Sequence, residues 1–141
     1  MLALLHAASQ AELRHLRVTD VDHSGRRVRL GHRPHPVPLD PTTWAALQAC
    51  LDHRTTLATT NPHVLVTRGT KARQTPASVA YLCHVLDDAG VAVRTLRATR
   101  VTDLLAALDP KIVATALAMD AEGVLMYLRE DVDTARLPAN P

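Results

Sequence analysis

The sequence has few aromatic residues, few cysteines and no long hydrophobic run. Phenylalanine is absent, and aromatic residues make up 2% of the 141 residues. Stacking of exposed bases on aromatic side chains is therefore excluded as a main binding mode. The apolar stretch Leu2 to Leu5 is too short to cross a bilayer and lacks the flanks of a signal peptide. We therefore expect a cytoplasmic protein that makes no use of a membrane.

The sequence also lacks the common patterns for metals, nucleotides and covalent catalysis. Cys50 and Cys83 have no ligand spacing and occupy apolar helical positions, so we expect two reduced, buried thiols. His32 and His35 are close in sequence, but no cysteine or carboxylate stands at ligand spacing from them. There is no P-loop, GxGxxG, HExxH or GxSxG pattern. We expect no metal site and no cofactor.

What the sequence does contain is apolar surface and an uneven charge. Hydrophobic residues make up 47% of the chain, which is enough for one compact domain. We assign this domain to residues 1–133 and expect residues 134–141 to form a disordered tail. Residues 1–100 carry a net charge of +6, and residues 101–141 carry −4. This asymmetry favours a basic face that meets phosphate, and a solvated mixed surface is the alternative.

Short β-prone runs between Val18 and Leu39 predict a small three-stranded antiparallel sheet. Arg27 and Arg29 alternate with apolar residues, which places the two guanidiniums on the face opposite the core. Residues 63–67 are expected to be a short extended segment, followed by a polar, basic loop at residues 68–74.

The rest of the chain predicts helices. Proline after a capping residue marks three helix starts, at Asp40-Pro41, Thr75-Pro76 and Asp109-Pro110. The first helix should bury Trp44, Leu47 and Leu51. The second should bury Val79, Leu82, Cys83 and Leu86 and stop at Gly90. Further helices are expected at about residues 95–108, 110–119 and 121–130. The fold class is α+β and mostly α.

Four blocks of sequence, in order and in register, resemble the catalytic domain of tyrosine recombinases, the phage-integrase family. They are Ala11-Glu12-Leu13-Arg14-His15-Leu16 with Val18-Thr19-Asp20-Val21-Asp22, then Val37-Pro38-Leu39, Thr95-Leu96-Arg97-Ala98-Thr99 and Leu117 to Tyr127. The resemblance implies helices packed with a small three-stranded antiparallel sheet. It also implies duplex DNA as the partner and DNA integration or recombination as the setting.

The resemblance implies a nucleophilic tyrosine, two arginines that stabilise the phosphoryl oxygens, and a lysine and histidines that transfer protons. Only Arg97 and Tyr127 match this pattern. Ser9 stands where the first arginine is expected, and Met119 stands where a histidine is expected. The other departures are Arg94 in place of a histidine, and His32, Arg33 and His35 in the loop where the family has its lysine. We therefore expect strand cleavage to be absent or residual.

Arg97 shares a helical stripe with Val101, Leu104, Leu105 and Leu108, so its guanidinium is directed toward the core side. The sequence leaves two candidate partners for this guanidinium, a DNA phosphate and an internal carboxylate. Tyr127 borders an apolar stripe, so it is either a nucleophile or a structural tyrosine. The other expected DNA contacts are Arg27, Arg29, Arg33, Lys71, Arg73, Arg94 and Arg100. Such contacts predict weak, salt-sensitive binding.

Two alternatives stay open. One is a protein-interaction module that keeps the fold without binding DNA, for example a homo-oligomer in which copies exchange C-terminal segments. The other is a subunit whose site is completed by another chain.

Overall fold

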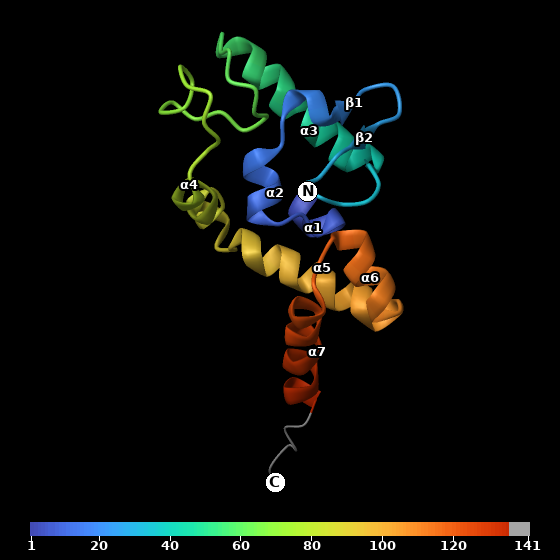
Figure 1. Ribbon diagram of the computed structural model, residues 1–141. Coiled ribbons are helices and arrows are strands. Elements are labelled where there is room, and N and C mark those ends of the chain that lie inside the picture. The colour runs from blue at the N-terminus through green and yellow to red at the C-terminus, as the bar shows by residue number, and fades with distance from the viewer. Residues whose placement is uncertain (136–141) are drawn as a thin grey trace.

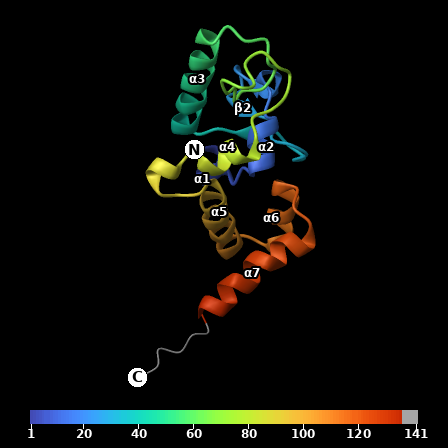
Figure 2. The ribbon, with the colours of Figure 1, turned by 90° about the vertical axis from the view of Figure 1, so that its left-hand side faces the viewer.

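The structure is a computed structural model that describes the backbone of residues 1–135 and the side chains of residues 1–129. Its helices are α1 (Leu2–His6), α2 (Gln10–His15), α3 (Pro41–Thr56), α4 (Val79–His84), α5 (Val93–Ala107), α6 (Pro110–Leu117) and α7 (Ala121–Ala135). Helices α1 to α3 and a small sheet form one end of the molecule, and α5 to α7 form the other (Figure 1). A view from the side shows the same division, with α7 directed away from the rest (Figure 2).

The sheet has the predicted number of strands. Its strands are β1 (Val21–Asp22), β2 (Arg27–Val28) and β3 (Val37–Pro38), which pair antiparallel in the order β1-β2-β3. Val28 pairs with Val21 on one side and with Val37 on the other. The mostly helical α+β fold with a three-stranded antiparallel sheet is therefore confirmed, although the strands are shorter than the β-prone runs.

The two faces of the sheet differ as the alternation predicts. Val28 and Leu30 are completely buried, whereas Arg27 and Arg29 are exposed. The extended segment predicted at residues 63–67 is present only in part: His63 forms an isolated β-bridge with Arg17, and the chain bends at residues 64 and 65. The Val64 amide donates to the Leu16 carbonyl at 2.8 Å and fixes this segment beside α2.

Two of the three predicted helix starts are confirmed. Asp40 caps α3 by accepting hydrogen bonds from the amides of Thr42 and Thr43, and Asp109 caps α6 through the Lys111 amide. The Thr43 hydroxyl and amide are the main cause that lowers the pKa of Asp40 to about 2. Proline suits the position after each cap because it has no amide hydrogen that needs a partner.

The predicted start at Thr75-Pro76 is wrong. Helix α4 begins only at Val79, capped by the Ser78 hydroxyl, and ends at His84 instead of running to Gly90. The reason is a contact from outside the segment: Arg14 Nε donates to the Ala77 carbonyl at 2.8 Å and holds the chain there in a non-helical form. A 3₁₀ turn (Asp87–Ala89) then leads to Gly90.

The burial predicted for this helix is also largely wrong. Leu82 is buried, but Val79 and Cys83 are exposed. Cys83 accepts a hydrogen bond from the Gln10 side chain at 3.6 Å, so it is a surface thiol and not the buried one expected. Both cysteines are nevertheless free.

The apolar interior consists of two clusters. The first joins the sheet to α3, where Leu47 and Leu51 are buried as predicted and Trp44 is partly buried. The second joins α1, α5 and α6, and the side chain of Tyr127 packs against it. Adjacent residues Ala7 and Ala8 belong to different clusters, so the end of α1 connects the two parts of the molecule.

The last three helices lie close to their predicted positions. Helix α7 continues to Ala135, beyond the expected end at residue 130. The predicted tail at residues 134–141 lies mostly outside the described residues, and its first two residues form the end of α7. Within the described part of the chain, none of the helices has the length and apolar composition that a membrane crossing requires.

Candidate functional site

Arg97 lies on the inner side of α5, as its helical position predicts. Val101 is buried and Leu104 and Leu105 are partly buried, but Leu108 is exposed because α5 ends one residue before it. The Arg97 side chain is half-buried, and its Nε atom is buried without a hydrogen-bond partner among the described residues. An unpaired guanidinium nitrogen away from water costs free energy, so this nitrogen favours an added anion.

The nearby carboxylates are already engaged. Glu12 and Asp120 line hollows that Arg97 also lines. The Glu12 oxygens accept from Arg33 Nε at 2.6 Å and from the Ser9 amide at 2.7 Å. Asp120 accepts from the Gly123 amide at 2.7 Å. The ion pairs between described residues are His6–Asp40, Glu12–Arg33 and His84–Asp87, and none involves Arg97.

Arg97 lines two larger hollows. We call the first the tyrosine-side hollow, which Arg94, Met119 and Tyr127 also line. The second is the histidine-side hollow, lined by His15, His32 and Arg97 together with Ser9, Glu12, Gly31, Met119 and neighbouring apolar residues. Ser9, Arg94, Arg97 and Tyr127 are among the residues that line a smaller hollow. Side chains from α2, α5, α7 and the loop after β2 therefore meet around one guanidinium.

Comparison with solved structures gives this arrangement a context. A crystal structure of XerA recombinase matches with a TM-score of 0.71 and 19% identity, over 97% of this chain and 56% of that chain. The Tn1549 transposon integrase, in complex with transposon right end DNA, matches with a TM-score of 0.66 and 12% identity, over 96% of this chain and 56% of that chain. The chain has the fold of a tyrosine-recombinase catalytic domain. It spans about half the length of either structure. No family model matches the sequence, and no curated protein does.

The recombinase fold brings together positions that are distant in sequence. Arg97, Tyr127 and Ser9 line one hollow, and His32 and Met119 lie on the walls of the neighbouring one. These are the positions that the resemblance assigned to the family's reaction chemistry. Their clustering around Arg97 is an observation of geometry, and the role of each residue stays a prediction.

Ser9 has a structural role of its own at this site. Its hydroxyl accepts from the Glu12 amide at 3.2 Å, and the Glu12 carboxylate accepts from the Ser9 amide at 2.7 Å. This reciprocal pair is a capping box that starts α2. The residue that replaces an expected arginine therefore stabilises a helix start and offers no charge to a phosphate.

Arg33 needs a correction, because the sequence predicted it as a DNA contact. Its side chain is 3% exposed, and its guanidinium binds both Glu12 oxygens, at 2.6 and 3.0 Å. It also donates to the carbonyls of His6 and Ala7, at 2.9 and 3.1 Å. A guanidinium with this many internal acceptors holds α1 and α2 together and has little surface to offer DNA.

The other predicted contacts lie on the surface away from the two hollows, except Arg94. Arg27 and Arg29 are exposed on the hairpin, and Lys71 and Arg73 are exposed on the loop after residue 67. Asn61 is completely buried and donates to the carbonyls of Thr70 and Thr75, both at 2.9 Å, which fixes this loop. Arg100 is half-buried and donates to the Leu5 carbonyl at 3.1 Å.

The sequence did not identify His15 as a residue of the site. It lies at the end of α2, one helical turn after Ala11, and both residues line the histidine-side hollow. Its place in the block that resembles the family was the available signal. Among residues with described side chains, no group of three or more His, Cys, Asp and Glu lies close enough to hold a metal ion.

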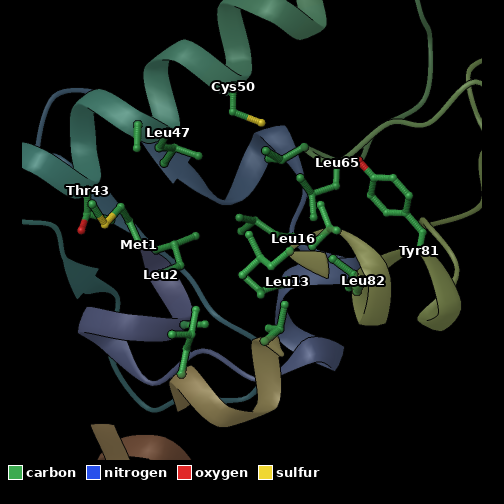
Figure 3. A pocket seen from close by; sticks show the side chains of 17 residues that line it. Met1, Leu2, Leu13, Leu16, Thr43, Leu47, Cys50, Leu65, Tyr81 and Leu82 are labelled. Atoms are coloured by element: carbon green, nitrogen blue, oxygen red, sulfur yellow. The ribbon is translucent and has the colours of Figure 1, made fainter. Parts of the chain in front are cut away.

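A separate apolar cavity of about 240 Å³ opens between α3 and α4 (Figure 3). Leu13, Leu47, Tyr81 and Leu82 line it, and none of the predicted site residues does. Cys50 is on its wall, and burial raises the pKa of that thiol, which makes it a weaker nucleophile. This cavity cannot stabilise an anion, so it is not part of the Arg97 site.

Proposed function

We propose that this domain binds the phosphate backbone of duplex DNA in DNA integration or recombination in the cytoplasm, with strand cleavage absent or residual. The observation that carries the proposal is the half-buried Arg97, which lines two open hollows and whose Nε has no hydrogen-bond partner among the described residues. A phosphate oxygen would supply the acceptor that this nitrogen lacks, and arginine suits phosphate because its planar fork makes paired hydrogen bonds.

Further basic residues extend this site. Arg94 borders the tyrosine-side hollow, and the half-buried Arg100 lies one turn beyond Arg97 on α5. Arg27, Arg29, Lys71 and Arg73 form two further basic surfaces, on the hairpin and on the loop that Asn61 fixes. Contacts of this kind add affinity by releasing counterions and do not read base sequence. Support for DNA as the partner also comes from the Tn1549 integrase, whose structure contains transposon DNA.

The replacement of expected catalytic residues around Arg97 argues against efficient strand cleavage. Ser9 and Met119 replace an expected arginine and histidine, and His32 and Arg94 stand near the positions of an expected lysine and histidine. Removal of one charge-stabilising donor typically costs about a hundredfold to a thousandfold in rate. Several such losses act on the same transition state, so Tyr127 has little assistance as a nucleophile.

We expect duplex binding to be weak, tolerant of sequence and steeply dependent on salt. With about four phosphate contacts, affinity should fall about a hundredfold as salt rises from about 50 to 200 mM. Fluorescence anisotropy with two unrelated duplexes measures this. Replacement of Arg27 and Arg29 by glutamine should reduce the slope of log affinity against log salt concentration. Lys111→Gln on α6 should leave this slope unchanged. Absence of any anisotropy change at low salt and high protein concentration would contradict DNA binding.

We also expect no covalent protein–DNA complex to accumulate on nicked suicide duplexes. Ser9 stands in place of the first arginine, so the phosphoryl charge that develops during attack by Tyr127 lacks half of its clamp. Denaturing gels of wild type and Tyr127→Phe should look alike. A shifted band that is present in wild type and lost in Tyr127→Phe would show that the domain still cleaves. Ser9→Arg alone should not restore cleavage, because such groups act together.

A protein-interaction module is the second candidate. The observation that favours it is the apolar cavity between α3 and α4, whose rim includes the exposed side chains of Tyr81 and Val85. In that case the free chain would associate through this face, and its mass in solution would depend on concentration but not on DNA. Size-exclusion chromatography with light scattering, with and without a short duplex, separates the two candidates.

A further inference from the structure

The histidine-side hollow contains two imidazoles next to Arg97. His15 comes from the end of α2, and His32 comes from the loop after β2, so two separate elements place them at one opening of about 380 Å³. Gly31 has a φ of +52°, and a Cβ there would lie 3.1 Å from the Glu12 side chain. A side chain there would combine a left-handed backbone with a tight contact to Glu12, so glycine lets the chain reach His32 without displacing Glu12.

The charges that face these imidazoles favour an anion. Glu12 is the one carboxylate on the described wall of this hollow, and its oxygens are bound by Arg33 and the Ser9 amide. Arg97 adds a guanidinium from α5. His15 also has Arg14 and Arg17 close in sequence, and the His63 ring lies 6.2 Å from its own, centroid to centroid. When the imidazoles take up protons, the hollow gains positive charge that no free carboxylate on the described wall offsets.

We propose that the histidine-side hollow is a second phosphate site, which binds the phosphate next to the one at Arg97 on the same DNA strand and strengthens on acidification. The site rests on the proposed DNA binding and adds a position and a pH dependence to it. Imidazole exchanges its proton between about pH 5 and pH 8, and a protonated ring donates charge-assisted hydrogen bonds to a phosphate oxygen. The bound strand would then run from His32 across Arg97 toward Arg94 and Tyr127.

The test is duplex affinity at pH 5.5 and pH 8.0 at constant ionic strength, measured on the whole chain. Wild type should bind about tenfold tighter at the lower pH, because a hydrogen bond to a charged group has that order of effect. The double variant His15→Gln/His32→Gln should lose this gain and keep the affinity seen at pH 8.0. His53→Gln/His84→Gln removes two exposed histidines that do not line this hollow and should keep the gain, which controls for overall charge.

A second double variant places a positive charge at both histidine positions at either pH of the test. His15→Lys/His32→Lys should bind at pH 8.0 as tightly as wild type binds at pH 5.5. The inference is overturned if the glutamine double variant keeps the full pH response, or if the lysine double variant binds no tighter than wild type at pH 8.0. Either result, with Arg97-dependent binding intact, leaves the proposed function standing. If wild type binds no duplex at either pH, both proposals fail.

Discussion

Arg33→Ala should destabilise the domain by about 3 to 5 kcal/mol, the typical result of removing one partner of a buried ion pair. The Glu12 side chain is 12% exposed, so without Arg33 its charge would remain in a place that water barely reaches. The carbonyls of His6 and Ala7 would lose their donors as well. For a domain of this size the melting temperature should fall by roughly 10 °C or more. Thermal melts followed by circular dichroism measure this.

Two further variants separate the ion pair from a general effect of removing arginine. Arg29→Ala removes an exposed guanidinium from the same hairpin and should change stability by less than about 0.5 kcal/mol. The double variant Arg33→Met/Glu12→Leu removes both charges, so it should be less destabilised than Arg33→Ala. If Arg33→Ala melts within about 2 °C of wild type and binds DNA poorly, Arg33 would be a surface contact after all.

The same pair predicts how stability depends on pH. Burial alone raises the pKa of Glu12, but the hydrogen bonds from Arg33 and from the Ser9 amide outweigh it and leave the pKa below its usual value of 4.5. A carboxyl whose pKa is lowered on folding contributes stability above its unfolded pKa and loses it as pH falls through the folded value. Wild type should therefore lose this contribution below about pH 4.5. The difference in the free energy of unfolding between wild type and Arg33→Ala should therefore be largest at neutral pH and should shrink in acid.

The sequence predicts most accurately those features that depend on neighbouring residues. Asp40-Pro41 and Asp109-Pro110 start helices because the cap and the proline act within one turn. Thr75-Pro76 has a similar local pattern and fails, because Arg14, which is 63 residues before Ala77, binds the carbonyl of Ala77. A local pattern does not contain that contact.

The candidate site shows the same limit. The alternation of residues around β2 predicts correctly that Arg27 and Arg29 are exposed, and Arg33 was assigned to the same basic surface. Its actual partner, Glu12, lies 21 residues earlier, and nothing local to Arg33 indicates the pair. For Arg97 the stripe predicts the inner face of α5, but not whether a carboxylate of the protein pairs with it. That depends on the engagement of Glu12 and Asp120 by other groups, which only the folded arrangement reveals.

Arg97→Ala should have the opposite effect to Arg33→Ala. In the free protein the buried Nε of Arg97 lacks a partner among the described residues, so truncation removes an unpaired polar atom. The melting temperature should stay the same or rise slightly. Duplex affinity should fall about tenfold or more, because a hydrogen bond between a guanidinium and a phosphate is lost. Melting curves and anisotropy on the same preparation measure both.

Matched variants separate the effect of the positive charge of Arg97 from the effect of its planar guanidinium. Lys111→Ala removes one positive charge from the exposed surface of α6 and should leave affinity nearly unchanged at moderate salt. Arg97→Lys keeps the charge but loses the planar fork, so its affinity should lie between those of wild type and Arg97→Ala. A large thermal loss in Arg97→Ala with DNA affinity intact would mean that Arg97 is structural. The hollows would then be an inherited feature of the recombinase fold with no anion to bind. If the thermal stability holds and the affinity falls, Arg97 binds a DNA phosphate, although Ser9 and Met119 replace two of the groups expected beside it.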